Sequence, residues 1–138
     1  MSFLVPKNRT VKETNPWCYL DIAIQPDPII HADTNESKQL LSTYETIEMD
    51  LITWNTLILT SLNKLYGLIG ESSPFEIIKH NNNPLQKQII LKIQVEDQSK
   101  FNNSLMSYTF NLSKYFNDLN LNCNFKINKI ENYVGLVL

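Results

Sequence analysis

The feature that most constrains the fold is the alternation of two hydrophobic periods along the chain. Three segments place apolar residues at every second position, as in a strand with one buried face: residues 17–25, 88–95 and 121–128. Residues 75–80, which follow Pro74, are expected to form a further short strand. Two other segments, 54–65 and 101–115, place apolar residues three and four apart, as in an amphipathic helix. The expected order of elements is therefore β-α-β-β-α-β.

This order predicts an α+β protein: an antiparallel sheet with two helices packed on one face, the ferredoxin-like or RNA-recognition-like sandwich. Residues 133–138 are expected to form a fifth strand or an apolar tail. A length of 138 residues suits one domain, 1–138, with a sizeable core. Within it we expect a flexible N-terminal arm at 1–15 and an acidic loop or insertion at 26–49, with at most one helical turn at 40–44.

The boundaries of the first helix are marked by specific residues. Asp50 or Thr53 is expected to cap its N-terminus, because both side chains can accept a hydrogen bond from a free backbone N–H. Gly67 or Gly70 is expected to adopt the left-handed conformation at its C-terminus. Trp54, in the first turn, is expected in the core.

Cysteine content and hydropathy exclude several classes of protein. The chain has two cysteines, Cys18 and Cys123, which excludes a disulfide framework and a four-cysteine zinc site and favours a reducing compartment. The basic residues of segment 1–12 are followed by no apolar run, so this segment is expected to be neither a secretory signal nor a membrane anchor. No stretch reaches the ~18 apolar residues of a spanning helix. We expect a soluble intracellular protein.

Charge is distributed unevenly along the chain. The net charge is -2, and the single arginine, Arg9, rules out the guanidinium array typical of proteins that grip phosphates alone. Residues 13–78 carry ten acids and two bases, a net charge of -8, whereas residues 79–129 carry seven bases and three acids, a net charge of +4. Such polarity can orient a subunit between basic and acidic partners, although solvated faces of unequal sign would look the same.

No group of residues indicates catalysis, a metal or a cofactor. A phosphate-hydrolysing enzyme of this architecture needs an anion cradle after the first strand, and segment 26–28 is acidic and contains two prolines. His31 and His80 have no carboxylate or cysteine at a metal-ligand spacing and are expected at the surface. Cys18 is expected on the core face of its strand, where it cannot act as a nucleophile with His80.

The face of the sheet away from the helices carries half of a base-stacking platform. Trp17 and Tyr19 are expected to project from the first strand, but the other central strand offers Gln88, Ile90, Lys92 and Gln94, with no aromatic residue. Trp17, Tyr19 and Ile90 could instead form an apolar patch for a protein partner, or be covered by the N-terminal arm or the C-terminal tail.

Three short motifs, in this order and spacing, resemble one known family. They are Trp-Cys-Tyr-Leu at 17–20, Tyr-Gly-Leu-Ile-Gly-Glu at 66–71 and Cys-Asn-Phe at 123–125. Over about two-thirds of its length the chain resembles the small processing-of-precursors protein subunits of eukaryotic ribonuclease P and ribonuclease MRP. The resemblance implies a non-catalytic subunit of nuclear and nucleolar ribonucleoproteins, in which RNA performs the chemistry of precursor tRNA 5′ processing and precursor rRNA processing.

The resemblance also implies partners: a similar small subunit, a barrel-shaped subunit and the catalytic RNA through weak or indirect contact, with no membrane and no small-molecule substrate. For protein contacts we expect the outward sheet face or the exposed side of the first helix: Trp17, Tyr19, Ile90, Leu51, Leu59 and Leu68. The residues expected to face RNA are Lys79, Lys87, Lys92, Lys126 and Lys129. Two alternatives remain open, a ligand-sensing or dimerisation module of this fold and a free single-stranded RNA-binding protein.

Overall fold

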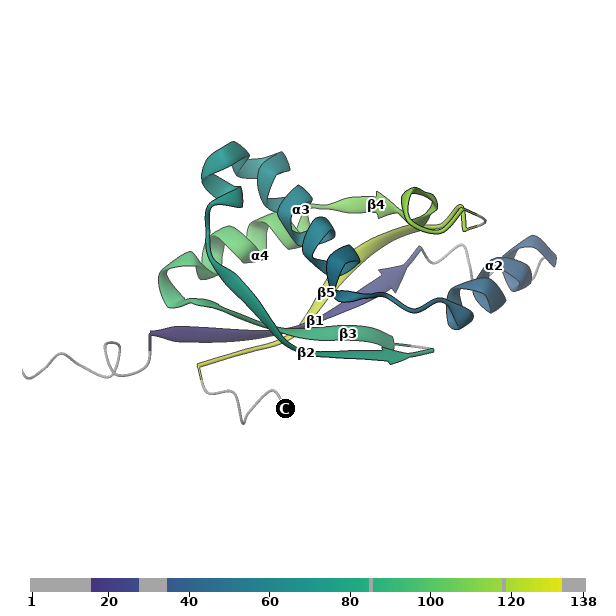
Figure 1. The fold of residues 1–138 in the computed structure, drawn as a ribbon, viewed down its shortest axis with the longest axis horizontal. Helices are drawn as coiled ribbons and strands as arrows, with labels where there is room; N and C mark the ends of the chain where they lie inside the picture. The colour runs from purple at the N-terminus through teal and green to yellow at the C-terminus, as the bar shows by residue number, and fades with distance from the viewer. Residues whose placement is uncertain (1–15, 28–34, 85, 118, 133–138) are drawn as a thin grey trace, which may run out of the picture.

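The computed structural model describes residues 16–27, 35–84, 86–117 and 119–132 (Figure 1). In chain order the elements are β1 (Trp17–Pro26), α2 (Asn35–Thr46), α3 (Leu51–Glu71), β2 (Phe75–Asn83), β3 (Gln86–Gln94), α4 (Gln98–Met106), β4 (Thr109–Asn111) and β5 (Asn122–Glu131). Short 3-10 turns at Val95–Asp97 and Leu112–Lys114 follow β3 and β4.

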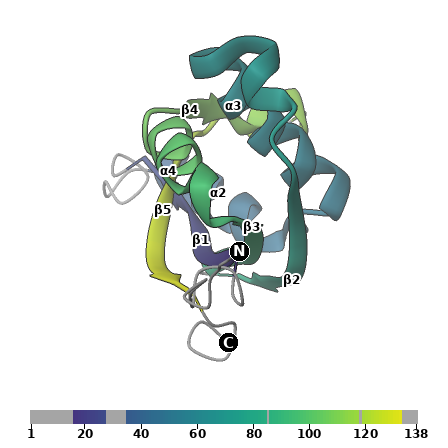
Figure 2. The same ribbon diagram turned by 90° about the vertical axis from the view of Figure 1, so that its left-hand side faces the viewer.

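The strands form one antiparallel sheet in the order β2-β3-β1-β5-β4. Helices α3 and α4 lie together over one face of it, and α2 lies at the end of the molecule where β1 finishes (Figures 1 and 2). The four long strands with α3 and α4 reproduce the expected β-α-β-β-α-β order. The α+β sandwich with helices on one face is therefore confirmed.

The core fills the space between the sheet and these two helices. Every second residue of β1 and β3 faces it, and α3 contributes its apolar stripe. The indole of Trp54 is fully buried and stacks on Phe125 of β5 with ring centres 6.0 Å apart, which confirms the expected core position of Trp54. The fully buried residues from these elements include Cys18, Leu20, Ile22, Leu57, Ile58, Leu62, Leu91, Ile93, Phe101 and Leu105.

Helix α3 is capped at its start and kinked near its end. The Thr53 N–H donates to the Asp50 carboxylate at 2.8 Å, so Asp50 is the N-cap. Gly67 has the left-handed φ of +65°, which breaks the helical geometry and redirects the last turn. Gly70 serves a different purpose: a Cβ there would collide with the backbone carbonyl of Leu62.

Two expectations about secondary structure are corrected, and two others fall outside the described residues. Segment 26–49, expected to be mostly loop, contains the twelve-residue helix α2. The second helix ends at Met106, because residues 109–111 leave the helical path and pair with Asn122–Asn124 of β5. This short strand β4 is the fifth strand of the sheet, whereas the fifth strand considered at 133–138 and the arm at 1–15 lie outside the described residues.

Candidate binding surfaces

The outer face, meaning the sheet face opposite α3 and α4, collects lysines from three strands. Residues directly opposite each other on neighbouring strands share a face. The pairs Tyr19–Lys92 and Lys92–Glu76 therefore place Lys92 on the outer face. The same reasoning from the strand register places three exposed lysines there, Lys79 opposite Ile90, Lys126 opposite Ala23 and Lys129 opposite Asp21.

Lys87, the fifth lysine expected to face RNA, does not belong to this face. It lies two residues before Ile89 on β3 and therefore points to the same inner face, where its side chain is 0% exposed. Its ammonium group lies 4.8 Å from the centre of the Tyr44 ring. Burial lowers the pKa of Lys87, while Glu45 and Glu48 partly oppose this effect. The expectation that Lys87 faces RNA is wrong. The sequence held a signal that could have corrected it, because alternate residues of a strand share a face and Lys87 alternates with the core residue Ile89.

Ile90 is a second correction on the sheet. Its side chain does lie on the outer face, opposite Asp21 and Lys79, but it is only 3% exposed. Asp21 and Ala23 beside it are buried as well, so the centre of the outer face is closed. Ile90 therefore offers no apolar surface to a partner, whereas Trp17 and Tyr19 remain half-buried at the end of the face where β1 begins.

The exposed side of α3 carries the larger apolar surface. Leu68 is 80% exposed and Ile69 is 72% exposed in the turn that follows the kink at Gly67. Leu51 is exposed at the start of the helix, whereas Leu59 is half-buried. Sequence reasoning missed Ile52, Ile69 and the exposure of Leu65. The available signal was the number of apolar residues in α3, which exceeds what one stripe can bury.

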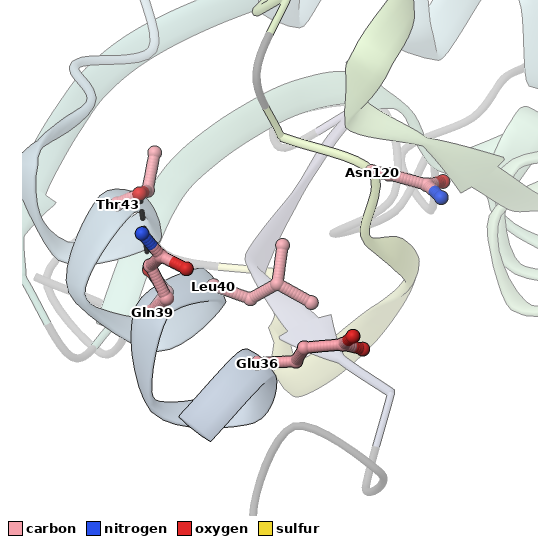
Figure 3. Close-up of a pocket in the computed structure, with 5 residues that line it drawn as sticks. All are labelled: Glu36, Gln39, Leu40, Thr43 and Asn120. Carbon is pink, nitrogen blue, oxygen red and sulfur yellow. Dashed lines mark hydrogen bonds between the residues drawn. The ribbon is translucent and has the colours of Figure 1, made fainter. Parts of the chain in front are cut away.

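A cavity of about 560 Å³ separates α2 from the segment before β5 (Figure 3). Figure 3 shows the side chains of Glu36, Leu40 and Asn120 at its wall, with Gln39 and Thr43 on the same helix. The Thr43 hydroxyl donates to the Gln39 carbonyl at 3.0 Å, which is a contact within the helix. Together these groups provide amides, one carboxylate and an apolar side chain, which suits polar contacts rather than bond-breaking chemistry.

The cysteines are held in unreactive positions. Burial raises the pKa of the Cys18 thiol, and burial together with the Asp27 carboxylate raises the pKa of the Cys123 thiol to about 12. Thiols with such pKa values are protonated at neutral pH and are poor nucleophiles. Within the described ranges no three His, Cys, Asp or Glu side chains are grouped to hold a metal ion, and no helix could cross a membrane.

The fold and its surfaces define a class: an α+β sandwich that presents an apolar helix end and a lysine-bearing sheet face. The particular family follows from comparison of sequences. Residues 16–108, from β1 into the turn after α4, match the family described as "Ribonucleases P/MRP protein subunit Pop8", and the chain belongs to this family.

A solved structure shares the fold. A chain in the structure titled "Cryo-EM structure of yeast Ribonuclease MRP" superposes with a TM-score of 0.62 at 14% sequence identity, over 86% of this chain and 75% of that chain. No curated protein sequence gives a significant match. The family expected from the three motifs is thus confirmed.

Proposed function

We propose that this chain is a non-catalytic subunit of ribonuclease P and ribonuclease MRP that assembles other protein subunits with the RNA. In this role it supports precursor tRNA 5′ processing and precursor rRNA processing in the nucleus and nucleolus. Membership of the Pop8 family supports this role. The structural observation that carries it is the apolar turn at the end of α3, where Leu68 and Ile69 are almost fully in water.

Such exposure is costly for a protein that works alone. Burial of one large aliphatic side chain contributes about 1.5–3 kcal/mol, so Leu68 and Ile69 together offer a strong anchor for another protein. We assign the exposed side of α3, including Leu51, to a protein partner. The partners proposed are a similar small subunit and a barrel-shaped subunit.

The outer face supports the second contact, with RNA. Lys79, Lys92, Lys126 and Lys129 can each approach a phosphate, but Glu76 and Asp21 on the same face reduce the net positive charge. Lysine also gives a phosphate no bidentate contact. The outer face therefore contributes modest RNA affinity that falls with added salt, and protein contacts dominate assembly.

The test is purification of a tagged full-length chain from its own cells, followed by identification of the RNA and proteins recovered with it. Recovery of a large structured RNA with companion subunits is expected. Recovery of the chain as a symmetric homodimer without RNA would instead support the ligand-sensing or dimerisation module and reject the proposal.

A further inference from the structure

A small hollow lies on the outer face beside the N-terminal ends of β1 and β2. It has a volume of about 190 Å³ and is lined by Trp17 of β1, Lys92 of β3 and the Pro74-Phe75-Glu76 segment that begins β2. The strand register explains the grouping, because Lys92 is opposite Glu76 on one side and Tyr19, two residues from Trp17, on the other. The sequence assigned Trp17 to protein contact and Lys92 to RNA contact, and the structure brings these two residues together in one hollow.

We propose that this hollow binds one unpaired nucleobase of the RNA, an inference that rests on the proposed function. Trp17 offers an aromatic face for stacking, and Lys92 offers a cation for the phosphate attached to the base. Glu76 has a carboxylate that accepts an N–H from the edge of a base. The three groups thus match the face of a base, its hydrogen-bonding edge and its phosphate.

The contact between Lys92 and Trp17 favours this occupant. The ammonium nitrogen lies 4.4 Å from the centre of the indole ring, where it covers an aromatic surface that would otherwise face water. A cation–π contact at a surface is weaker than the stacking of a base on an aromatic ring. An arriving base therefore displaces the flexible lysine, and the ammonium group moves to the phosphate of the same nucleotide.

An apolar protein segment fits the hollow less well. It would bury the Glu76 carboxylate and the Lys92 ammonium without supplying partners for them, and burial of unpaired charge is costly. One of the apolar lining residues is also committed elsewhere: Phe75 makes an edge-to-face contact with Phe101, with ring centres 6.0 Å apart. A run of stacked bases is excluded at β3, which continues from Lys92 to the buried Ile90, so the hollow takes a single base.

The experiment is ultraviolet cross-linking of the purified ribonucleoprotein, with the cross-linked peptides of the full-length chain identified by mass spectrometry. Three variants are compared: Trp17→Tyr keeps an aromatic face, Trp17→Leu keeps only apolar surface, and Lys114→Gln, at an exposed lysine outside the outer face, is the matched control. We expect a nucleotide attached within residues 17–20. The yield should be retained in Trp17→Tyr and Lys114→Gln and should fall about tenfold in Trp17→Leu, as loss of one stacked base implies.

Each other outcome overturns the inference. If RNA and companion subunits are recovered but residues 17–20 and 92 carry no nucleotide, the proposed function stands and the nucleobase site is wrong. If Trp17→Leu cross-links as well as the wild type, or if Trp17→Tyr releases a companion protein, Trp17 contacts protein instead. If no RNA is recovered with the wild-type chain, the proposed function and this inference fail together.

Discussion

The ammonium group of Lys87 lies 4.8 Å from the centre of the Tyr44 ring, on the inner face of the sheet beneath α2. Both side chains are buried, and neither the Lys87 Nζ nor the Tyr44 hydroxyl has a hydrogen-bond partner among the described residues. The aromatic ring compensates the charge only in part, because a buried ammonium group loses its hydration. This pair attaches α2 to the sheet at an energetic cost.

Replacement of Lys87 by Met should therefore stabilise the protein. Met keeps the length of the side chain and removes the buried charge, so we expect the free energy of unfolding at pH 7 to rise by about 1 kcal/mol in urea titrations. Lys79→Met, on the outer face, is the control and should change it by less than about 0.5 kcal/mol. A loss of stability in Lys87→Met would mean that the contact with Tyr44 outweighs the desolvation of the ammonium group.

The same pair predicts a pH dependence. Because the pKa of Lys87 is lowered in the folded chain, the unfolded chain holds the proton up to a higher pH. Between the lowered value and the ordinary value of 10.5 the unfolded state binds more protons, so this group makes stability rise with pH. Lys87→Met should lose this rise when the two proteins are compared across the alkaline range.

Cys123 should act in the opposite direction and resist modification. Its pKa is raised from 9.0 to about 12, so above pH 9 the unfolded chain loses the thiol proton first and stability falls as pH approaches 12. At pH 8 the native chain should react with a thiol reagent only when it opens, at a rate far below that in urea. Rapid labelling of the native protein would show that Cys123 is accessible and that its assigned burial is wrong.

The two glycines of α3 should differ in their response to substitution. Gly70→Ala places a methyl group against the Leu62 carbonyl, and the backbone must shift, so a loss of about 2–3 kcal/mol is expected. At Gly67 a methyl group meets open space, and only the backbone conformation is penalised, because φ +65° with ψ -147° is a combination that few residues other than glycine adopt, at a cost of about 1–3 kcal/mol. Thermal unfolding measures both losses, and an unchanged stability in Gly70→Ala would contradict the close approach at Gly70.

The cap of α3 gives a prediction with a conservative control. Asp50→Ala removes the acceptor of the Thr53 N–H and should lower the melting temperature, whereas Asp50→Asn should retain most of the stability. Hydrogen bonds from Thr53 lower the pKa of Asp50, so the ionised cap stabilises the fold above the ordinary pKa of the carboxyl group and loses this effect as pH falls through the lowered value. Equal losses in Ala and Asn variants would exclude the capping role.

The fold was predictable wherever apolar residues follow a regular period. The strands β1 and β3 and the stripe of α3 bury the residues that their periods select. Helix α2 was missed because its stripe is short and weakly apolar: Ser37, Leu40, Leu41 and Tyr44 follow the helical spacing, but one of the four is a serine and polar residues surround them. The end of α4 was ambiguous, since Tyr108 and Leu112 fit a helical spacing while Tyr108, Phe110 and Leu112 fit a strand, and pairing with β5 decides for the strand.

The binding surfaces were predictable only in part. The charge distribution and the family resemblance assigned Lys79, Lys92, Lys126 and Lys129 to a common role, and the register places all four on the outer face. The sequence could not reveal that Lys92 covers the Trp17 ring, because that contact joins residues on two strands. Nor could it reveal the exposure of Ile69, which depends on the kink at Gly67.

The central claim, that the chain joins protein subunits through the end of α3, is tested by one comparison of recovered complexes. The tagged wild-type chain, the double variant Leu68→Asp with Ile69→Asp, and the control Ser99→Asp with Ser113→Asp, which adds the same charge at exposed positions outside α3, are purified from cells and the companion proteins are quantified. We predict full recovery with the wild type and the control and at most about a tenth with the Leu68 and Ile69 variant. Equal recovery in all three would contradict the account.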